Sequence, residues 1–290
     1  MAAAASASVS SPGLGLALRK LFRRKVVLAG AVALVVLVLL ALFAPFASPY
    51  DPSALKVLER LRGPSALHWF GTDEFGRDIF TRVVVGARYS LTIGALTVLI
   101  ATVAGTLLGL CAGYFRRLDT PIMRVVDAMM AFPDILLAIA LMAMLGASLF
   151  NVVLALAIVY TPRIARIVRA STLVVRELLF VEAARALGVS TARILFRHIL
   201  LNTLSPILVQ ATFIFAYAIL AEAGLSFLGV GVPPEIPTWG TMVAAGQQFA
   251  DQAFWVVLYP GLAIVIAALS LQMVGDGLRD MLDPRLRKSL

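Results

Sequence analysis

Six long apolar runs constrain the fold of this 290-residue chain more than any other feature. A helix needs roughly 20 apolar residues to cross a bilayer core of about 30 Å. The runs are continuously apolar and lack the alternation of membrane barrel strands, so they predict helices. The predicted spans are 26–47, 89–113, 123–145, 149–168, 204–228 and 254–273. We therefore expect an all-α membrane protein with six transmembrane helices.

The distribution of charge supports a membrane location and predicts an orientation. Only 14% of the residues are charged and 61% are hydrophobic, so the net charge of +9 indicates basic loops beside a bilayer rather than a nucleic-acid surface. With the N-terminus inside, 19 of the 25 Lys and Arg residues fall on the cytoplasmic side, in segments 19–25, 116–124, 163–197 and 279–288. Both termini are therefore expected in the cytoplasm.

Several function classes are excluded by motifs that the sequence lacks. No G-x-x-x-x-G-K-[ST] loop or G-x-S-x-G elbow is present, and two His and one Cys form no metal-ligand cluster. We therefore predict no catalytic residue, no metal site and no cofactor in this chain. A secondary transporter or channel would need inverted repeats or a chain of intramembrane ionisable groups, and the sequence shows neither.

The segment between the fourth and fifth spans is predicted to form two short cytoplasmic helices. Residues 177–187 are amphipathic, and Gly188 can adopt the left-handed conformation that ends a helix. Ser190 or Thr191 can cap the next helix. The apolar face of the first helix comprises Leu178, Val181, Ala184 and Leu187.

Small residues in this first helix would let a partner surface approach its backbone closely. They are Ala183, Ala184 and Ala186. Leu187 would fill a pocket of the partner, and Glu182 would meet a polar or cationic group. From the residues alone, the alternative is a helix that only packs beneath the bundle.

Ionisable residues near the fourth and third spans each have two interpretations. Three arginines fall three residues apart on one helical stripe. They either extend their charged ends toward water near the inner surface or form a basic rim at the inner mouth of a passage. They are Arg163, Arg166 and Arg169. Asp127 and Asp134 flank Pro133 in the third span and are expected to pair with Arg116, Arg117 or Arg124.

Two features lie toward the outer side. Glu222 is an acidic residue clearly within the fifth span, where it either hydrogen bonds to a neighbouring helix or lines a passage. Residues 71–78 predict a turn that leads into an amphipathic helix, with Thr72 or Asp73 as its cap.

The pattern Glu182-Ala183-Ala184 followed by Gly188 resembles the coupling motif of binding-protein-dependent ABC importer permeases. The sequence departs from that motif at His198 and Leu201. Four further stretches resemble the second permease subunit of the dipeptide, oligopeptide and nickel branch of this family. They lie at 70–91, 123–133, 225–240 and 275–285.

This resemblance implies a type I ABC transmembrane domain over 88–277, with a cytoplasmic coupling helix. A cytoplasmic tail (1–25), the first span (26–47) and an extracytoplasmic loop with a short helix (48–87) would precede it, and a cytoplasmic tail (278–290) would follow. Glu182, Ala183, Ala184, Leu187 and Gly188 would couple the chain to an ATPase. The outer loop with Pro233, Pro234 and Trp239 would dock a solute-binding protein.

The resemblance also implies partners, a location and a cargo. The partners are a homologous second permease, one or two ABC ATPase subunits that bind ATP and Mg²⁺, an extracytoplasmic solute-binding protein and the lipid bilayer. The location is the bacterial inner or plasma membrane. The expected cargo is a small peptide, with nickel, glutathione or haem as alternatives.

Overall fold

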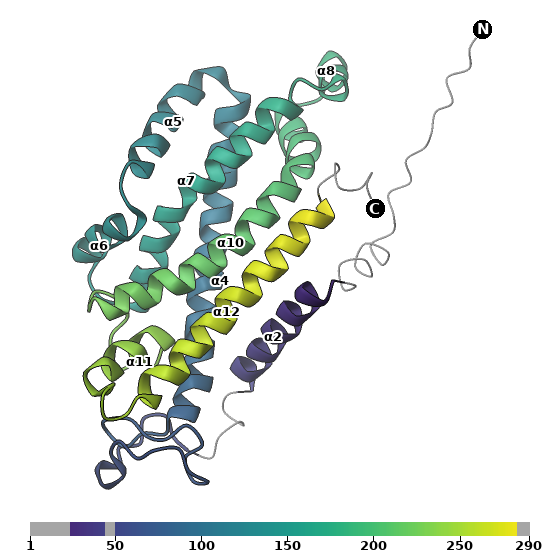
Figure 1. The fold of residues 1–290 in the computed structure, drawn as a ribbon. Helices are drawn as coiled ribbons and strands as arrows, with labels where there is room; N and C mark the ends of the chain where they lie inside the picture. Colours follow the sequence, from purple (N-terminus) through teal and green to yellow (C-terminus); the bar gives the residue numbers. More distant parts are fainter. Residues whose placement is uncertain (1–23, 44–49, 283–290) are drawn as a thin grey trace.

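The chain forms a bundle of long helices in the computed structural model, which describes residues 24–43 and 50–282 (Figure 1). Five helices of this part are long and apolar enough to cross a membrane. They are α2 (Lys25–Leu42), α4 (Ile79–Tyr114), α7 (Leu149–Val175), the helical segment Thr191–Phe227 that contains α10 (Leu200–Phe227), and α12 (Trp255–Leu282). The predicted all-α membrane fold is confirmed. Most of the two predicted tails, and residues 44–47 of the predicted first span, lie outside the described residues.

The third predicted span, 123–145, is not one straight helix. It is divided between α5 (Arg116–Met130) and α6 (Asp134–Leu145), whose axes differ by 95°. Pro133 stands at the N-cap of α6 and disfavours a helical conformation for the residue before it. The pair therefore makes either one broken span or a re-entrant segment, and the count of candidate spans is five or six.

The fifth span begins much earlier than the predicted residue 204. A short helical turn at Thr191–Arg193 continues through a π-helical segment at Ile194–Ile199 into α10. The prediction of a second short cytoplasmic helix is therefore wrong, because that segment is the first part of the long helix Thr191–Phe227. Ser190 precedes it as N-cap but makes no side-chain capping hydrogen bond.

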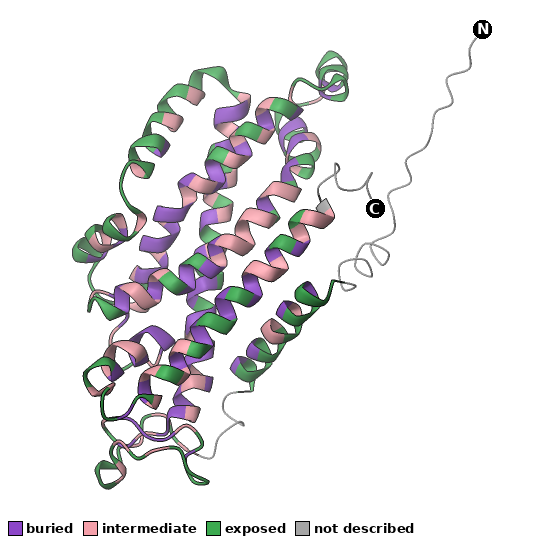
Figure 2. Cartoon of the chain, in the orientation of Figure 1, coloured by how far each residue is buried: buried purple, intermediate pink, exposed green. Residues whose placement is uncertain are grey.

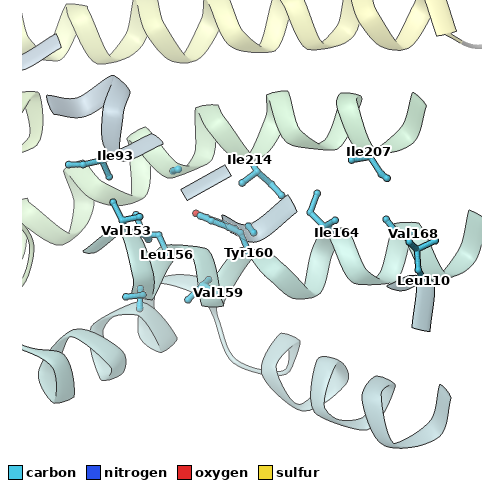
Figure 3. Close-up of a cluster of buried hydrophobic side chains, with 14 of the residues drawn as sticks. Ile93, Leu110, Val153, Leu156, Val159, Tyr160, Ile164, Val168, Ile207 and Ile214 are labelled. Atoms are coloured by element: carbon cyan, nitrogen blue, oxygen red, sulfur yellow. The ribbon is translucent and has the colours of Figure 1, made fainter. Parts of the chain in front are cut away.

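Helices α4 and α7 form the most extensive helix–helix contact among the described residues. An added Cβ atom at Gly105, Gly109 or Gly113 would lie 2.6 Å from a side-chain carbon of the facing residue of α7. Facing residues include Ile164 and Val168, which belong to the buried core in Figure 3. Glycines four residues apart on one helix face allow two helices to approach closely.

The bundle has two distinct ends. One end, called the α8 end, carries the short helix α8 (Leu179–Ala186) together with the start of α2 and the end of α12, which are joined by an ion pair between Arg24 and Asp280 (Figure 1). The other, called the α11 end, carries α11 (Trp239–Gly246) and residues 50–78.

Residues 71–78 form a turn at the α11 end, as expected, but the predicted cap is wrong. Asp78 is the N-cap of α4, and its carboxylate accepts a hydrogen bond of 2.8 Å from the backbone N–H of Thr81. Asp73 instead closes the turn by accepting hydrogen bonds from the backbone N–H groups of Phe75 and Arg77, each 2.9 Å long. The helix that follows is α4 itself, which begins ten residues before the predicted span.

Candidate functional site

Helix α8 is a short helix with a sharply defined end. Gly188 has φ of +73°, the left-handed conformation that a residue without Cβ adopts at least cost. The N–H of Val189 bonds to the carbonyl of Ala184, and the N–H of Gly188 bonds to the carbonyl of Arg185. These two hydrogen bonds define a Schellman motif, so the predicted role of Gly188 as the helix terminator is confirmed.

The predicted apolar face of α8 is divided between the bundle and the surface. Val181 and Ala184 are buried in the same cluster as Ile194 and Ile199, at the start of the long helix Thr191–Phe227. Leu187, in contrast, is 83% exposed. A direct contact of Ala184 with a partner is therefore a wrong prediction, because this side chain anchors α8 to its own bundle.

The outward surface of α8 combines apolar and acidic groups. Leu179 is 82% exposed, and Glu182, Ala183 and Ala186 are exposed beside it and Leu187 (Figure 2). Small alanines between two protruding leucines make a surface that a complementary cleft can approach closely. The guanidinium of Arg185 lies 5.0 Å from the centre of the Tyr114 ring, which ties α8 to the end of α4.

Glu222 lies inside the protein at the α11 end. Its side chain is 1% exposed, and one carboxylate oxygen accepts hydrogen bonds from Ser226 Oγ (2.9 Å) and Thr238 Oγ1 (2.7 Å). Thr238 is the N-cap of α11, so the carboxylate joins α10 to the start of α11. The prediction that Glu222 lines a passage is therefore wrong, and the alternative of a carboxylate bonded within the protein describes its contacts.

Trp239 in the predicted outer docking loop is fully buried. Its indole N–H donates a hydrogen bond of 2.9 Å to the backbone carbonyl of Val83, and its backbone N–H bonds to Ser90 Oγ at 3.1 Å. A docking contact by Trp239 is therefore a wrong prediction, because this residue fastens α11 to α4. Pro234 is exposed and Pro233 is half-buried, so this part of the loop reaches the surface.

The three arginines of α7 each pair with an aspartate of α5 or α6, an arrangement that we call the Arg–Asp ladder. Its rungs are Arg163–Asp134, Arg166–Asp127 and Arg169–Asp119. In the third rung two guanidinium nitrogens of Arg169, Nε and Nη2, donate to the two carboxylate oxygens of Asp119, at 2.5 and 2.7 Å. The predicted pairing of Asp127 and Asp134 with Arg116, Arg117 or Arg124 is wrong.

The ladder also corrects both interpretations of the arginine stripe. Helix α7 continues to Val175, beyond the predicted residue 168, so Arg163 lies near the middle of this 27-residue helix. The arginines are therefore neither snorkelling at a helix end nor an unpaired basic rim. The sequence carried a signal, because three aspartates spaced eight and seven residues apart precede three arginines spaced three apart.

Comparison with known proteins gives the family. The model of the binding-protein-dependent transport system inner membrane component matches residues 79–288, and the model of the N-terminal transmembrane domain of oligopeptide transport permease C matches residues 12–64. The chain therefore belongs to the family of binding-protein-dependent transport system inner membrane components. Its long apolar helices make it a multi-pass membrane protein, and the family match makes it a transporter subunit.

Three relatives and one solved structure illustrate this membership. A protein of Brucella suis that is provisionally named a peptide transport system permease is 50% identical, with 98% of each chain covered. The dipeptide transport system permease DppC of Alkalihalophilus pseudofirmus is 48% identical (93% and 90% covered), and the glutathione transport system permease GsiD of Pectobacterium atrosepticum is 42% identical (93% and 90% covered). A chain of the MetNI methionine ABC transporter has the same fold, with a TM-score of 0.58 at 19% identity over 70% of this chain and 97% of that one.

Proposed function

We propose that this chain is one permease subunit of an ATP-driven importer of short peptides, and that helix α8 is where the ATPase acts on it. The peptide transport names of relatives 48–50% identical over most of the chain support this cargo. Nickel, glutathione and haem are the alternatives, and the glutathione permease at 42% identity favours glutathione among them.

The basic residues support a cytoplasmic α8 end and cytoplasmic termini. Segments 116–124, 163–197 and 279–288, together with 19–25, hold 19 of the 25 Lys and Arg residues, and such an excess is typical of cytoplasmic loops. The α11 end then faces the extracytoplasmic side of the bacterial inner membrane. There the surface around Pro233 and Pro234 docks the solute-binding protein.

The exposed face of α8 enters a cleft of the ATPase. Leu187 and Leu179 supply apolar contact, and Glu182 meets a polar or cationic group of the cleft. Val181 and Ala184 pack against the start of the long helix Thr191–Phe227, so a push on α8 is passed to that helix. Gly188 keeps the end of α8 in a fixed geometry during this contact.

A homologous permease completes the passage, and one or two ATPase subunits bind ATP and Mg²⁺ on the cytoplasmic side. ATP-driven closure of the ATPase pair biases the bundle toward an outward-facing arrangement that it already populates. The close seam between α4 and α7 makes these two helices move together. The ATPase subunits hydrolyse ATP, and this chain supplies half of the passage and the helix on which the ATPase acts.

The experiment is co-purification of the ATPase with variants of α8. Glu182→Lys reverses an exposed charge without touching the core, and Gly188→Pro removes both the left-handed φ and the N–H that bonds to Arg185. Both variants are expected to lose the ATPase while keeping the partner permease. Glu235→Lys, the same charge reversal at the exposed α11 end, is the matched control and is expected to retain it. Undiminished ATPase binding by both α8 variants would refute the coupling role.

A further inference from the structure

A cavity of about 240 Å³ lies between α6, α7 and α10, and one of its lining residues is Asp134, the partner of Arg163 in the first rung of the Arg–Asp ladder. Its lining includes Asp134, Tyr160 and Tyr217 together with apolar side chains of α6 and α10. We call it the tyrosine pocket. Tyr160 lies between α7 and α10, next to Ile214 (Figure 3), and its hydroxyl donates a hydrogen bond of 3.4 Å to the backbone carbonyl of Tyr217.

The position of the pocket indicates that it faces a passage rather than lipid. Arg163 lies near the middle of α7, and the side chains of Arg163 and Asp134 are 31% and 39% exposed. Exposing charged groups of a spanning helix to hydrocarbon is costly, so such groups face protein or water. The second rung is more exposed still, at 49% and 60%, on the same side of the bundle. This side therefore faces the interior of the assembled transporter.

The first rung has surroundings that the other two rungs lack. The guanidinium carbon of Arg163 lies 5.4 Å from the ring centres of both Tyr160 and Tyr217, and the same guanidinium pairs with Asp134. Neither Arg166 nor Arg169 has a ring contact of this kind among the described residues. Aromatic rings attract cations over their faces, and such rings recognise organic ammonium groups in other proteins. The surroundings of the Arg163 guanidinium are therefore ones that suit an organic cation.

We propose that the tyrosine pocket binds the two charged ends of a short, unblocked peptide during its passage, by exchange with the Arg163–Asp134 ion pair. The ammonium group of the peptide takes the place of Arg163 beside Asp134 and the tyrosine rings. The released guanidinium binds the peptide carboxylate. This inference rests on the proposed function as a peptide importer, and it names the residues that meet the cargo.

The charge balance of the Arg163–Asp134 pair favours a zwitterionic ligand over a singly charged one. Removing one partner of an ion pair leaves the other charge uncompensated, which is unfavourable beside the mainly apolar side chains that line this pocket. A zwitterion supplies both charges at once, so each group of the pair keeps an opposite charge beside it. A lone metal cation or an anion would compensate only one group. The volume of about 240 Å³ also lies below the roughly 300–1,000 Å³ of pockets for drug-sized ligands, so it suits a dipeptide or one end of a longer peptide.

The rest of the ladder allows this exchange without loosening the bundle. Asp134 is the first residue of α6, beyond the 95° bend, whereas Asp127 and Asp119 lie on α5. When the first rung opens, the other two rungs still hold α5 against α7. Those rungs have the same chemistry and lie outside the pocket, so they provide matched controls.

The test measures protection of the pocket by a dipeptide in the purified complex of both permeases and the ATPases. Leu220, which lines the pocket and is 42% exposed, is replaced by Cys on a Cys111→Ser background and labelled with a charged thiol reagent. Saturating alanyl-alanine is expected to slow labelling at least about fivefold, which corresponds to about 80% occupancy. N-acetylalanyl-alaninamide, which lacks both charges, is expected to leave the rate unchanged.

Variants assign the effect to the first rung. Asp134→Asn and Arg163→Gln are expected to lose protection by alanyl-alanine at least about tenfold in half-saturating concentration, whereas Asp127→Asn and Arg166→Gln retain it within about twofold. Equal protection by the blocked peptide, absence of protection, or equal loss in the second-rung variants would overturn the proposal. So would a Leu220→Cys variant that the reagent never labels, because the partner permease would then cover this face.

Failure of this inference is distinguishable from failure of the proposed function. ATP-dependent uptake of radiolabelled alanyl-alanine by proteoliposomes that contain the complex and its binding protein tests the function as a peptide importer. A complex that takes up the dipeptide but shows no protection at Leu220→Cys refutes only the pocket. A complex that takes up no peptide at all refutes the proposed cargo.

Discussion

Substituting Ala for Gly109 is expected to force α4 and α7 apart where these two helices pack most closely. The added Cβ would lie 2.6 Å from both the carbonyl oxygen of Ala165 and the Cβ of Val168, where ordinary contacts begin near 3.4 Å. The helices must therefore separate by roughly 0.8 Å at this point, and the neighbouring glycines lose their close contacts as well. Overpacking of this kind typically costs about 1–3 kcal/mol.

The assay for Gly109→Ala is thermal unfolding of the purified complex in detergent. A soluble domain of similar size loses about 2–4 °C for each kcal/mol, so a fall of several degrees is expected. Gly224→Ala is the matched control, because its added Cβ meets only Ile135 Cδ1 at 3.6 Å and gains the same helix propensity of up to about 1 kcal/mol. If the two variants unfold at the same temperature, the close packing of α4 on α7 does not contribute to stability.

Three further outcomes follow from the α11 end. Glu222→Gln is expected to keep the complex assembled and its stability within about 1 kcal/mol of the wild type, because the amide oxygen still accepts hydrogen bonds from Ser226 and Thr238. Glu222→Leu leaves both hydroxyls without this acceptor and is expected to lower stability by about 1–3 kcal/mol in the same unfolding assay. Trp239→Ala is expected to lower stability by about 3–5 kcal/mol, and a variant with normal stability but lost binding-protein docking, measured by pull-down, would contradict the buried role. Partial desolvation raises the pKa of the Glu59 carboxyl, but hydrogen bonding to His68 and the charge of Lys56 outweigh it and hold the pKa below 4.5. A lowered pKa in the folded state stabilises segment 50–78 above about pH 4.5, and this stabilisation is lost as the pH falls further. The protection of this segment against hydrogen exchange, measured relative to the intrinsic rate at each pH, should therefore fall in acid less in Glu59→Gln than in the wild type.

The features that depend on a local stretch of sequence were predictable, because an apolar run or a glycine after an amphipathic segment is a local property of the chain. The membrane class, five helical spans and the terminating role of Gly188 followed from them. Helix ends were less predictable, since α4 begins at Ile79 in a polar segment and α7 continues past Arg163. Hydropathy places a span where lipid contacts it, whereas a helix continues as long as its backbone hydrogen bonds do.

Pairing and burial of polar residues could not be read from the sequence. Asp134 and Arg163 are 29 residues apart and meet only because α5 and α6 bend back along α7. Trp239 and Val83 are 156 residues apart, and nothing local distinguishes a buried Trp in a proline-rich loop from an exposed one. Ala184 and Leu187 carry the same amphipathic signal, and only the packing of α8 on Ile194 and Ile199 separates an anchor from a contact surface.

The unbroken helix from Thr191 to Phe227 has a mechanical consequence. Its 37 residues make a rod about 55 Å long, with α8 packed at one end and Glu222 near the other. If the α8 end serves as pivot, a tilt of only about 5° displaces the far end by about 5 Å, roughly one helical turn. Because the carboxylate of Glu222 accepts a hydrogen bond from Thr238, the N-cap of α11, that displacement is passed to the first turn of α11.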